Sequence, residues 1–198
     1  MAERLASGRH NLSREQVSAN QKQRLFKALG AVMSTKGYNN TTVEDLITEA
    51  GVSRATFYQH FTSKQDCFMS AFARMQRHVI SAVEAVPDTG PPMERFSVML
   101  ERYLDFMALD PSMARLFLVE VYAAGPDALR RRVELQQEFV AGIAAIFDAR
   151  SDEDRFACQM LVAAVAAMVT NALTDGDPGA VTALHGPILG FTKKVMNG

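Results

Sequence analysis

Apolar residues recur along most of the chain at the three- and four-residue spacing of amphipathic helices, and no stretch alternates as a strand does. This spacing predicts helices at about 13–37, 43–50, 53–61, 64–86, 93–109, 111–124, 126–149, 152–174 and 181–196. We therefore expect an all-α fold of about nine helices. A three-helix helix-turn-helix domain would come first, followed by a larger C-terminal helical domain.

The residues at the helix ends agree with these limits. Gly37 is expected in a left-handed conformation after the first helix, and Gly51 allows a sharp turn between two short helices. Pro111 and Pro126 suit a first helical position, whereas Pro187 should delay or kink the last helix. Capping boxes are expected at Ser13/Gln16, at Thr41/Glu44 or Thr42/Asp45, and at Ser63/Asp66.

The two short helices joined at Gly51 could be a simple packing motif, so their side chains decide the interpretation. Phe57 and Phe61, four residues apart, would anchor the second helix to the core. The side chains that then project elsewhere suit base edges, with Arg for guanine, Gln for adenine and Thr or Ala for a thymine methyl: Arg54, Ala55, Thr56 and Gln59. Phosphate contacts are expected from Thr42, Ser53, Tyr58, His60 and Lys64.

Many of these residues stand at offsets typical of one family. The matching motifs are Gly37-Tyr38, Thr41-Thr42-Val43, Ala50-Gly51-Val52-Ser53, Thr56-Phe57-Tyr58, His60-Phe61 and Ser63-Lys64. Over roughly residues 20–70 the chain resembles the DNA-binding domain of TetR-family transcriptional regulators, and the remainder matches only in length and helical content. The resemblance implies a cytoplasmic, ligand-responsive regulator, most often a repressor. It would bind a palindromic double-stranded DNA operator as a homodimer and be released by a small apolar or amphipathic effector.

On this basis we expect a flexible arm at 1–12, a DNA-binding domain at 13–63 and a ligand-binding and dimerisation domain at 64–198, with helix 64–86 linking the two. The basic residues of the arm (Arg4, Arg9, His10) and Arg14 could reach a minor groove or simply be solvated, and both readings stay open.

Methionine and aromatic side chains are dense between residues 93 and 147. A helical core explains most of them, but an apolar pocket with a few polar groups would use the same residues. The expected lining is Phe96, Met99, Tyr103, Met107, Phe117, Glu120, Val121, Phe139, Ile143, Met168 and Asn171.

The last two long helices carry apolar faces that are too extensive for one protomer to cover. We expect them to pair with their mates across a dimer interface formed by Phe156, Leu161, Val165, Val169, Leu184, Ile188, Phe191 and Val195. The resemblance implies a four-helix bundle there. A twofold dimer would place two recognition helices roughly 34–36 Å apart, in successive major grooves.

Composition restricts the function less than these motifs do. The chain is 48% hydrophobic, 22% charged and has a net charge of −1, as in ordinary globular proteins. Residues 1–70 hold nine Lys/Arg and six Asp/Glu, a local basic excess that suits phosphate but could arise by chance. Cys67 and Cys158 lack metal-ligand spacing and are expected as packing residues, with redox sensing as the alternative.

No Ser/His/Asp set, Gly-rich phosphate loop or metal cluster is visible in the sequence, so we expect no enzyme activity, no cofactor and no metal. No apolar run is long enough to predict a membrane partner. Two alternatives remain. The chain could be an enzyme or carrier on a helical scaffold in which the helix-turn-helix only packs, or a constitutive DNA binder whose body serves only dimerisation.

Overall fold

The computed structural model describes residues 13–86 and 88–196, and over these ranges the secondary structure is helical, without a strand. The all-α expectation is therefore confirmed. The expected arm at 1–12 lies outside the described residues. The expected nine helices correspond to α1–α8 and a final helix that the structure divides into two.

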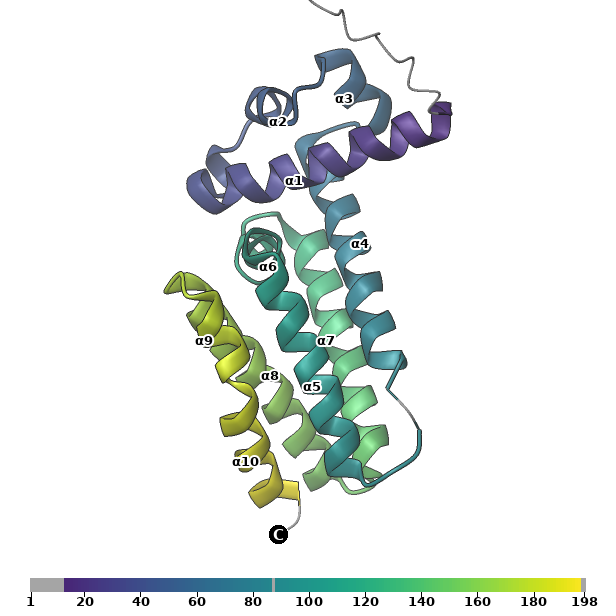
Figure 1. Ribbon diagram of the computed structural model, residues 1–198, viewed down its shortest axis with the longest axis vertical. Coiled ribbons are helices and arrows are strands. Elements are labelled where there is room, and N and C mark those ends of the chain that lie inside the picture. The colour runs from purple at the N-terminus through teal and green to yellow at the C-terminus, as the bar shows by residue number, and fades with distance from the viewer. Residues whose placement is uncertain (1–12, 87, 197–198) are drawn as a thin grey trace, which may run out of the picture.

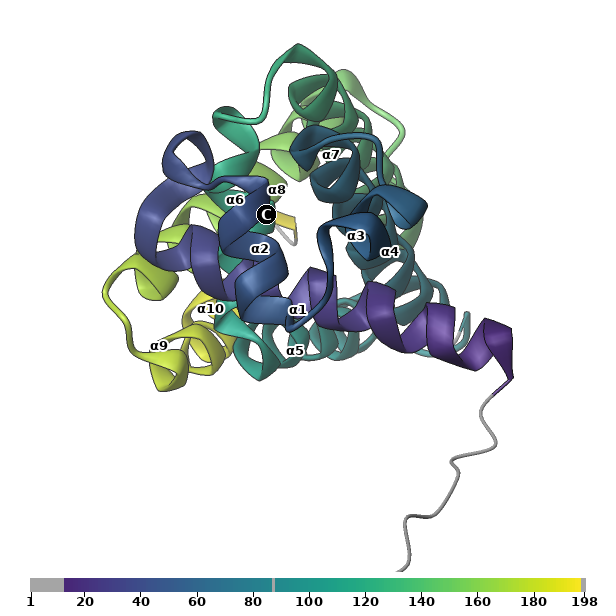
Figure 2. The same ribbon diagram turned by 90° about the horizontal axis from the view of Figure 1, so that it is seen from above.

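The first three helices form a layer at one end of the molecule (Figure 1). They are α1 (Arg14–Asn40), α2 (Val43–Ala50) and α3 (Arg54–His60). α1 lies across the end of the body and contacts α2, α3, α4 and α6. Seen from above, α2 and α3 lie on the outer side of this layer (Figure 2). The layer thus presents its two short helices away from the rest of the chain.

The remaining helices form an elongated bundle beneath this layer (Figure 1). They are α4 (Lys64–Glu84), α5 (Pro92–Leu109), α6 (Pro111–Leu118), the 3-10 turn η1 (Glu120–Tyr122), α7 (Pro126–Phe147), α8 (Asp152–Thr174), α9 (Pro178–Ala183) and α10 (His185–Met196). One core cluster runs from the upper layer into the bundle. The cluster includes Phe57 and Phe61 of the upper layer, and Phe72 of α4 stacks on Phe117 of α6 with ring centroids 4.6 Å apart. The two parts therefore share packing through α4 and α6.

Most of the expected helix ends are confirmed. The capping boxes at Ser13 and Thr42 are present, and Pro111 and Pro126 occupy first-turn positions. Ser63 accepts the backbone N–H of Asp66, but the Asp66 carboxylate accepts from Thr62, so the expected reciprocal box is not formed. The short polar side chains are close enough in sequence to find these backbone groups without help from the tertiary fold.

Gly37 interrupts α1 with a positive φ of 73°, as expected, but its ψ of 163° is extended rather than left-handed helical, and one more turn follows to Asn40. Two other expected boundaries were wrong. The helix expected at 111–124 ends at Leu118 and continues as η1. The last helix is divided at Leu184, and Pro187 lies in the first turn of α10, where its missing N–H breaks no helical bond.

Candidate functional site

The turn between α2 and α3 depends on Gly51, whose φ of 58° and ψ of 43° are left-handed. The Val52 N–H closes the turn on the Ile47 carbonyl at 3.0 Å. From α1, Arg24 Nη2 donates to the Gly51 carbonyl at 2.8 Å. A Cβ on Gly51 would lie 2.7 Å from the same Arg24 nitrogen. The angle at which α3 leaves the turn is thus set by local backbone chemistry and by α1.

One face of α3 is buried and the other is free. Ser53 Oγ accepts the Thr56 N–H at 3.0 Å and caps the helix. Phe57 and Phe61 are buried, as expected from their spacing. Opposite them lie the exposed side chains of Arg54, Ala55, Tyr58 and Gln59, with Thr56 half-buried beside them. The face expected to read bases is open to solvent, and its individual base contacts stay predictions.

Arg54 has weak partners within the molecule. Its Nη1 lies 3.6 Å from Glu44 Oε2, and its Cζ lies 5.7 Å from the centre of the Tyr58 ring. Both members of the ion pair are largely exposed, and such pairs are worth about 0–1 kcal/mol. Arg54 can therefore leave Glu44 for a stronger acceptor at little cost.

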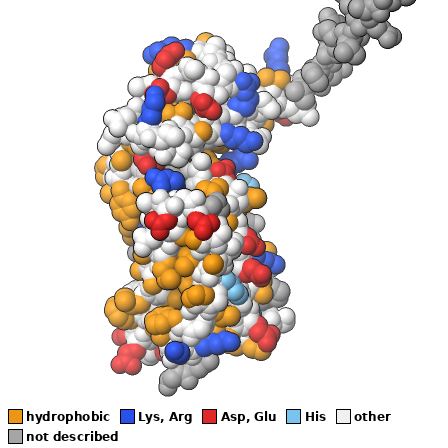
Figure 3. Space-filling model, turned by 60° about the vertical axis from the view of Figure 1, so that its left-hand side comes forward, with side chains coloured by type: hydrophobic (Ala, Val, Ile, Leu, Met, Phe, Trp, Pro, Cys, Tyr) orange, Lys and Arg blue, Asp and Glu red, His pale blue; other side chains and the backbone are white. Residues whose placement is uncertain are grey.

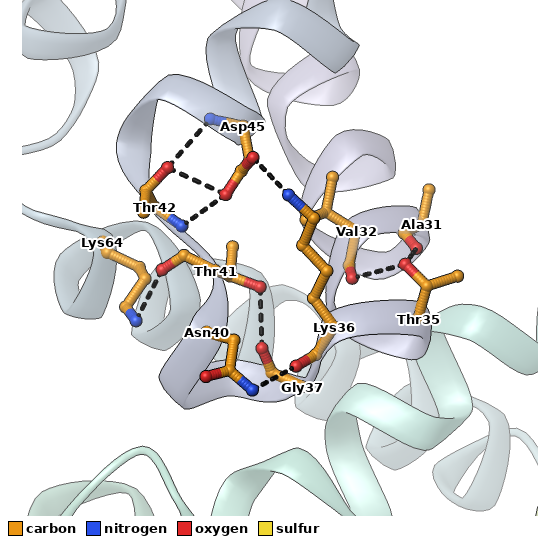
Figure 4. Close-up of polar contacts among 10 residues, drawn as sticks. All are labelled: Ala31, Val32, Thr35, Lys36, Gly37, Asn40, Thr41, Thr42, Asp45 and Lys64. Carbon is orange, nitrogen blue, oxygen red and sulfur yellow. Dashed lines mark hydrogen bonds and ion pairs between the residues drawn. The ribbon is translucent and has the colours of Figure 1, made fainter.

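The start of α2 carries a denser network, drawn in Figure 4. Thr42 Oγ1 donates to Asp45 Oδ2 at 2.8 Å, and Lys36 Nζ binds Asp45 Oδ1 at 2.6 Å. The bond from Lys36, reinforced by the N–H and hydroxyl of Thr42, lowers the pKa of Asp45 to about 2. The expected phosphate contact of the Thr42 side chain would require its hydroxyl to leave Asp45. Sequence reasoning found the Thr42–Asp45 cap but missed Lys36.

Lys64, at the start of α4, holds the connection between α1 and α2. Its Nζ donates to the carbonyls of Tyr38 at 2.6 Å and Thr41 at 2.8 Å, and it lies 4.2 Å from the centre of the Tyr38 ring (Figure 4 shows the bond to Thr41). Burial lowers the pKa of Lys64. An ammonium group has three donors, so one remains for the expected phosphate contact.

His60 links α3 to α1, because its Nε2 lies 2.9 Å from Gln21 Oε1. Burial and, secondarily, the charge of Lys22 lower the pKa of His60, so the imidazole is neutral at neutral pH. Because Gln21 Oε1 can only accept, Nε2 carries the single proton of the neutral imidazole, and the expected phosphate contact would require this N–H to leave Gln21. That contact stays a prediction, as do those of Ser53 and Tyr58.

Glu120 joins the bundle to the upper layer. The backbone N–H of Tyr38 donates to Glu120 Oε2 at 2.6 Å, and the glutamate is 9% exposed. Its expected place in a pocket was wrong, because the ending of α6 at Leu118 brings it against the end of α1 instead. The two residues are 82 positions apart, and no sequence signal connects them.

A cavity of about 60 Å³ lies among α5, α6, α7 and α8. Six of the expected pocket residues line it: Phe96, Met99, Tyr103, Phe117, Phe139 and Ile143. The other lining residues are Leu100, Leu118, Arg132, Leu135, Gln136, Val162, Val165 and Ala166. Arg132 and Gln136 were not expected there, because the sequence of α7 does not show which of its polar side chains turn toward the cavity.

The remaining expected pocket residues lie elsewhere. Met107 and Val121 are buried in the core without lining this cavity. Met168 and Asn171 are exposed on the outer face of α8, so their assignment was wrong. The inward stripe of α8 at the cavity is formed by Val162, Val165 and Ala166 instead.

The outer faces of α8 and α10 expose large apolar side chains. Phe156 is 61%, Phe191 57% and Val195 44% exposed. Figure 3 shows hydrophobic side chains gathered on the lower body on this side of the molecule. The exposed methionines Met160 and Met168 belong to the same helix α8. Of the expected interface residues, Phe156, Phe191 and Val195 are therefore available to a partner.

The other expected interface residues were assigned to the wrong face. Leu161, Val169 and Ile188 are buried in the protomer's own core. Val165 lines the cavity and Leu184 is half-buried. The helices are apolar on more than one side, so hydrophobicity alone did not distinguish the inward stripe from the outward one.

No group of three or more His, Cys, Asp or Glu side chains suitable for a metal ion occurs among the described residues. Cys67 and Cys158 are both buried and free. Burial, with a smaller contribution from Asp66, raises the pKa of the Cys67 thiol to about 12, which leaves it unreactive at neutral pH.

The sequence of this chain is similar to those of known regulatory proteins. Residues 25–71 match the family model described as bacterial regulatory proteins, tetR family. The HTH-type transcriptional activator FasR of Mycolicibacterium smegmatis is 28% identical over 104 residues, which are 52% of this chain and 48% of FasR. The chain spans about half the length of the curated relatives it matches.

Solved structures extend the likeness to the whole fold. The fatty acid degradation regulator FadR of Bacillus halodurans is 19% identical, with a TM-score of 0.74 over 89% of this chain and 98% of FadR. FadR of Bacillus subtilis in complex with stearoyl-CoA is 18% identical, with a TM-score of 0.72 over 85% and 95% of the two chains. The family match thus identifies residues 25–71 as a helix-turn-helix segment of the tetR type, and the solved structures show that the rest of the chain shares the fold of such regulators.

Proposed function

We propose that this protein is a cytoplasmic DNA-binding transcriptional regulator that reads a palindromic operator as a homodimer. The observation that carries the proposal is the free face of α3, where Arg54, Ala55 and Gln59 stand opposite the buried Phe57 and Phe61 inside the matched segment 25–71. The enzyme alternative is set aside because the family consists of regulatory proteins. Each α3 would enter a major groove with its first turn toward the bases.

The proposed dimer pairs α8 and α10 with their copies in a second protomer. The exposed Phe156 and Phe191 support it, since large apolar side chains gathered on one face mark interaction sites. By length and composition α8 could also cross a membrane, which is weak evidence for a single helix. We favour the partner helix as its cover because α8 and α10 continue one apolar surface. The division into a DNA-binding part at 13–63 and a sensing and dimerising part at 64–198 follows from this proposal.

The sensing role rests on the cavity. A cavity of about 60 Å³ holds only a few water-sized groups, for each of which about 10–15 Å³ is needed. A larger effector would have to move the lining helices apart. We propose that the effector prefers this expanded state and the operator the closed one, so that each weakens the binding of the other. The stearoyl-CoA bound to FadR of Bacillus subtilis supports an amphipathic effector. We propose that the protein is a repressor and that the effector releases it from DNA.

The first experiment selects bound duplexes from random DNA and measures their affinity by fluorescence anisotropy at several salt concentrations. Arg54→Ala should weaken the selected site by about 1–3 kcal/mol and relax the preference at one base position. Arg130→Ala, which removes an exposed arginine paired with Asp127 on α7, is the matched control and should leave the affinity unchanged. An unselective library, or equal effects of the two variants, would contradict the base-reading role of α3.

The second experiment tests the dimer by sedimentation equilibrium. Phe191→Glu places a charge in the proposed interface and should shift the protein toward monomer. Leu109→Glu changes an equally apolar side chain that is 82% exposed on α5 and should not. If Phe191→Glu sediments as the wild type does, the α8–α10 face is not the interface.

A further inference from the structure

The cavity is lined by one cationic group whose hydrogen-bonding capacity is only partly used. Arg132, on α7, has a buried Nε with no hydrogen-bond partner. Its Nη1 donates to Gln136 Oε1 at 3.1 Å, and its Cζ lies 4.8 Å from the centre of the exposed Tyr122 ring. None of the described carboxylates forms an ion pair with it. A guanidinium N–H buried without an acceptor is unfavourable, and native structures rarely leave one so.

Two other polar groups line the cavity with Arg132. Gln136 presents an amide, and Tyr103 presents a phenol whose ring meets Phe139 at 5.9 Å. Burial raises the pKa of Tyr103, against a smaller opposite effect of the Arg132 charge, so the phenol stays protonated and can donate. The polar side of the cavity therefore offers donors from an arginine, an amide and a phenol. Among the described residues, no carboxylate lines it.

The rest of the cavity is apolar. Its walls are formed by aliphatic and aromatic side chains that include Phe96, Met99, Phe117 and Ile143. An occupant that satisfies both parts needs one acceptor group of negative charge and an apolar body. A group with several charges does not fit, because a single cation lines the site and each unpaired charge would be costly to bury.

We infer that the effector is an organic acid with a single carboxylate, which Arg132 binds together with Gln136 and Tyr103, and an apolar body that occupies the cavity in its expanded state. The inference rests on the proposed function, since it names the ligand class of the same sensing cavity. Arg132, on α7, lies beside Tyr122, and Tyr122 belongs to the same η1 turn as Glu120 at the end of the bundle nearest the DNA-binding layer. The carboxylate would thus bind close to the junction between the two parts.

The test uses the full chain without DNA and isothermal titration calorimetry at pH 7.5. The probes are octanoate and 3-phenylpropionate, each compared with its neutral amide, and octanoyl-CoA. At least one acid should bind 10-fold or more tightly than its amide. The preference should disappear in Arg132→Gln and fall partway in Arg132→Lys, which keeps the charge but not the planar fork. Arg131→Gln, which removes the neighbouring exposed arginine paired with Glu134, should keep it.

Several outcomes would overturn the inference: no binding of either acid, equal binding of acids and amides, tighter binding of octanoyl-CoA than of octanoate, or equal losses in Arg131→Gln and Arg132→Gln. Circular dichroism and melting curves show whether each variant is folded, and Arg132→Lys keeps the test decisive if Arg132→Gln is not. Operator affinity is measured separately. Selective DNA binding without acid binding refutes the inference and leaves the proposed function standing, whereas acid binding without DNA affinity refutes the proposed function.

Discussion

Replacing Glu120 by alanine removes the carboxylate that accepts the backbone N–H of Tyr38 at 2.6 Å. The bond is buried, and it connects the turn after α6 to the end of α1. Hydrogen bonds to a charged group contribute about 1.5–3 kcal/mol, and a buried donor left without an acceptor costs about as much. We therefore expect Glu120→Ala to reduce the free energy of unfolding by about 2–3 kcal/mol.

Glu120→Gln separates the acceptor from its charge. The glutamine carbonyl can accept the same N–H, and neutral hydrogen bonds contribute about 0.5–1.5 kcal/mol, so the loss should be about half as large. For a chain of this length each kcal/mol corresponds to roughly 2–4 °C in Tm. Urea and thermal unfolding at one fixed protomer concentration measure both variants, because association shifts apparent stability.

Glu138→Ala, at an exposed position of α7, is the control and should change stability by less than about 0.5 kcal/mol. A Glu120→Ala variant as stable as this control would show that the bond to Tyr38 contributes nothing. Equal losses in Glu120→Gln and Glu120→Ala would show that an acceptor at this position is not what stabilises the junction.

The same bond has a functional consequence if the proposed function is right. Phe117 and Leu118, which line the cavity, precede Glu120 with Val119 between, and the carbonyl of Tyr38 accepts a hydrogen bond from Lys64. We expect Glu120→Ala to weaken the effect of an effector on operator affinity more than it weakens either binding alone. Unchanged coupling would mean that the cavity communicates with α3 by another route, such as α4.

Other predictions follow from single residues of the upper layer. Gly51→Ala should lower stability by about 1–2 kcal/mol, because an L-residue is strained at this positive φ and the Arg24 side chain must shift; an unchanged Tm would refute this. The pKa of Asp45 lies at about 2, below its ordinary 3.8, so the stability it contributes should be complete above about pH 4 and lost as the pH falls through about 2. Lys36→Met should raise that pKa toward 3.8, as NMR titration of the carboxyl would show, and an unmoved value would contradict the assigned cause. Lys64→Gln should weaken all duplexes alike and reduce the salt slope by about 1, and a sequence-dependent loss would argue against a phosphate contact.

The features that could be predicted from the sequence are those that neighbouring residues control. The helix-turn-helix followed from Gly51 and from the spacing of Phe57 and Phe61, because turn conformation and helical periodicity act over a few residues. Thr42 and Asp45 found each other as a cap for the same reason. The density of methionine and aromatic residues between 93 and 147 also identified six cavity residues, since large apolar side chains are expected to form the interior of the bundle.

The tertiary structure decided which of several apolar faces turns inward and which distant groups meet. Leu161 and Val169 are buried in the core, whereas Phe156 is exposed. The packing of α8 on α6 and α7, and not hydrophobicity alone, determines which row of α8 side chains faces inward. Glu120 binds the backbone of Tyr38 instead of lining the expected pocket. Arg132 lines the cavity, although its helix carries mostly polar residues. Such choices depend on where whole helices lie relative to one another, and the local pattern of side chains carries no information about that placement.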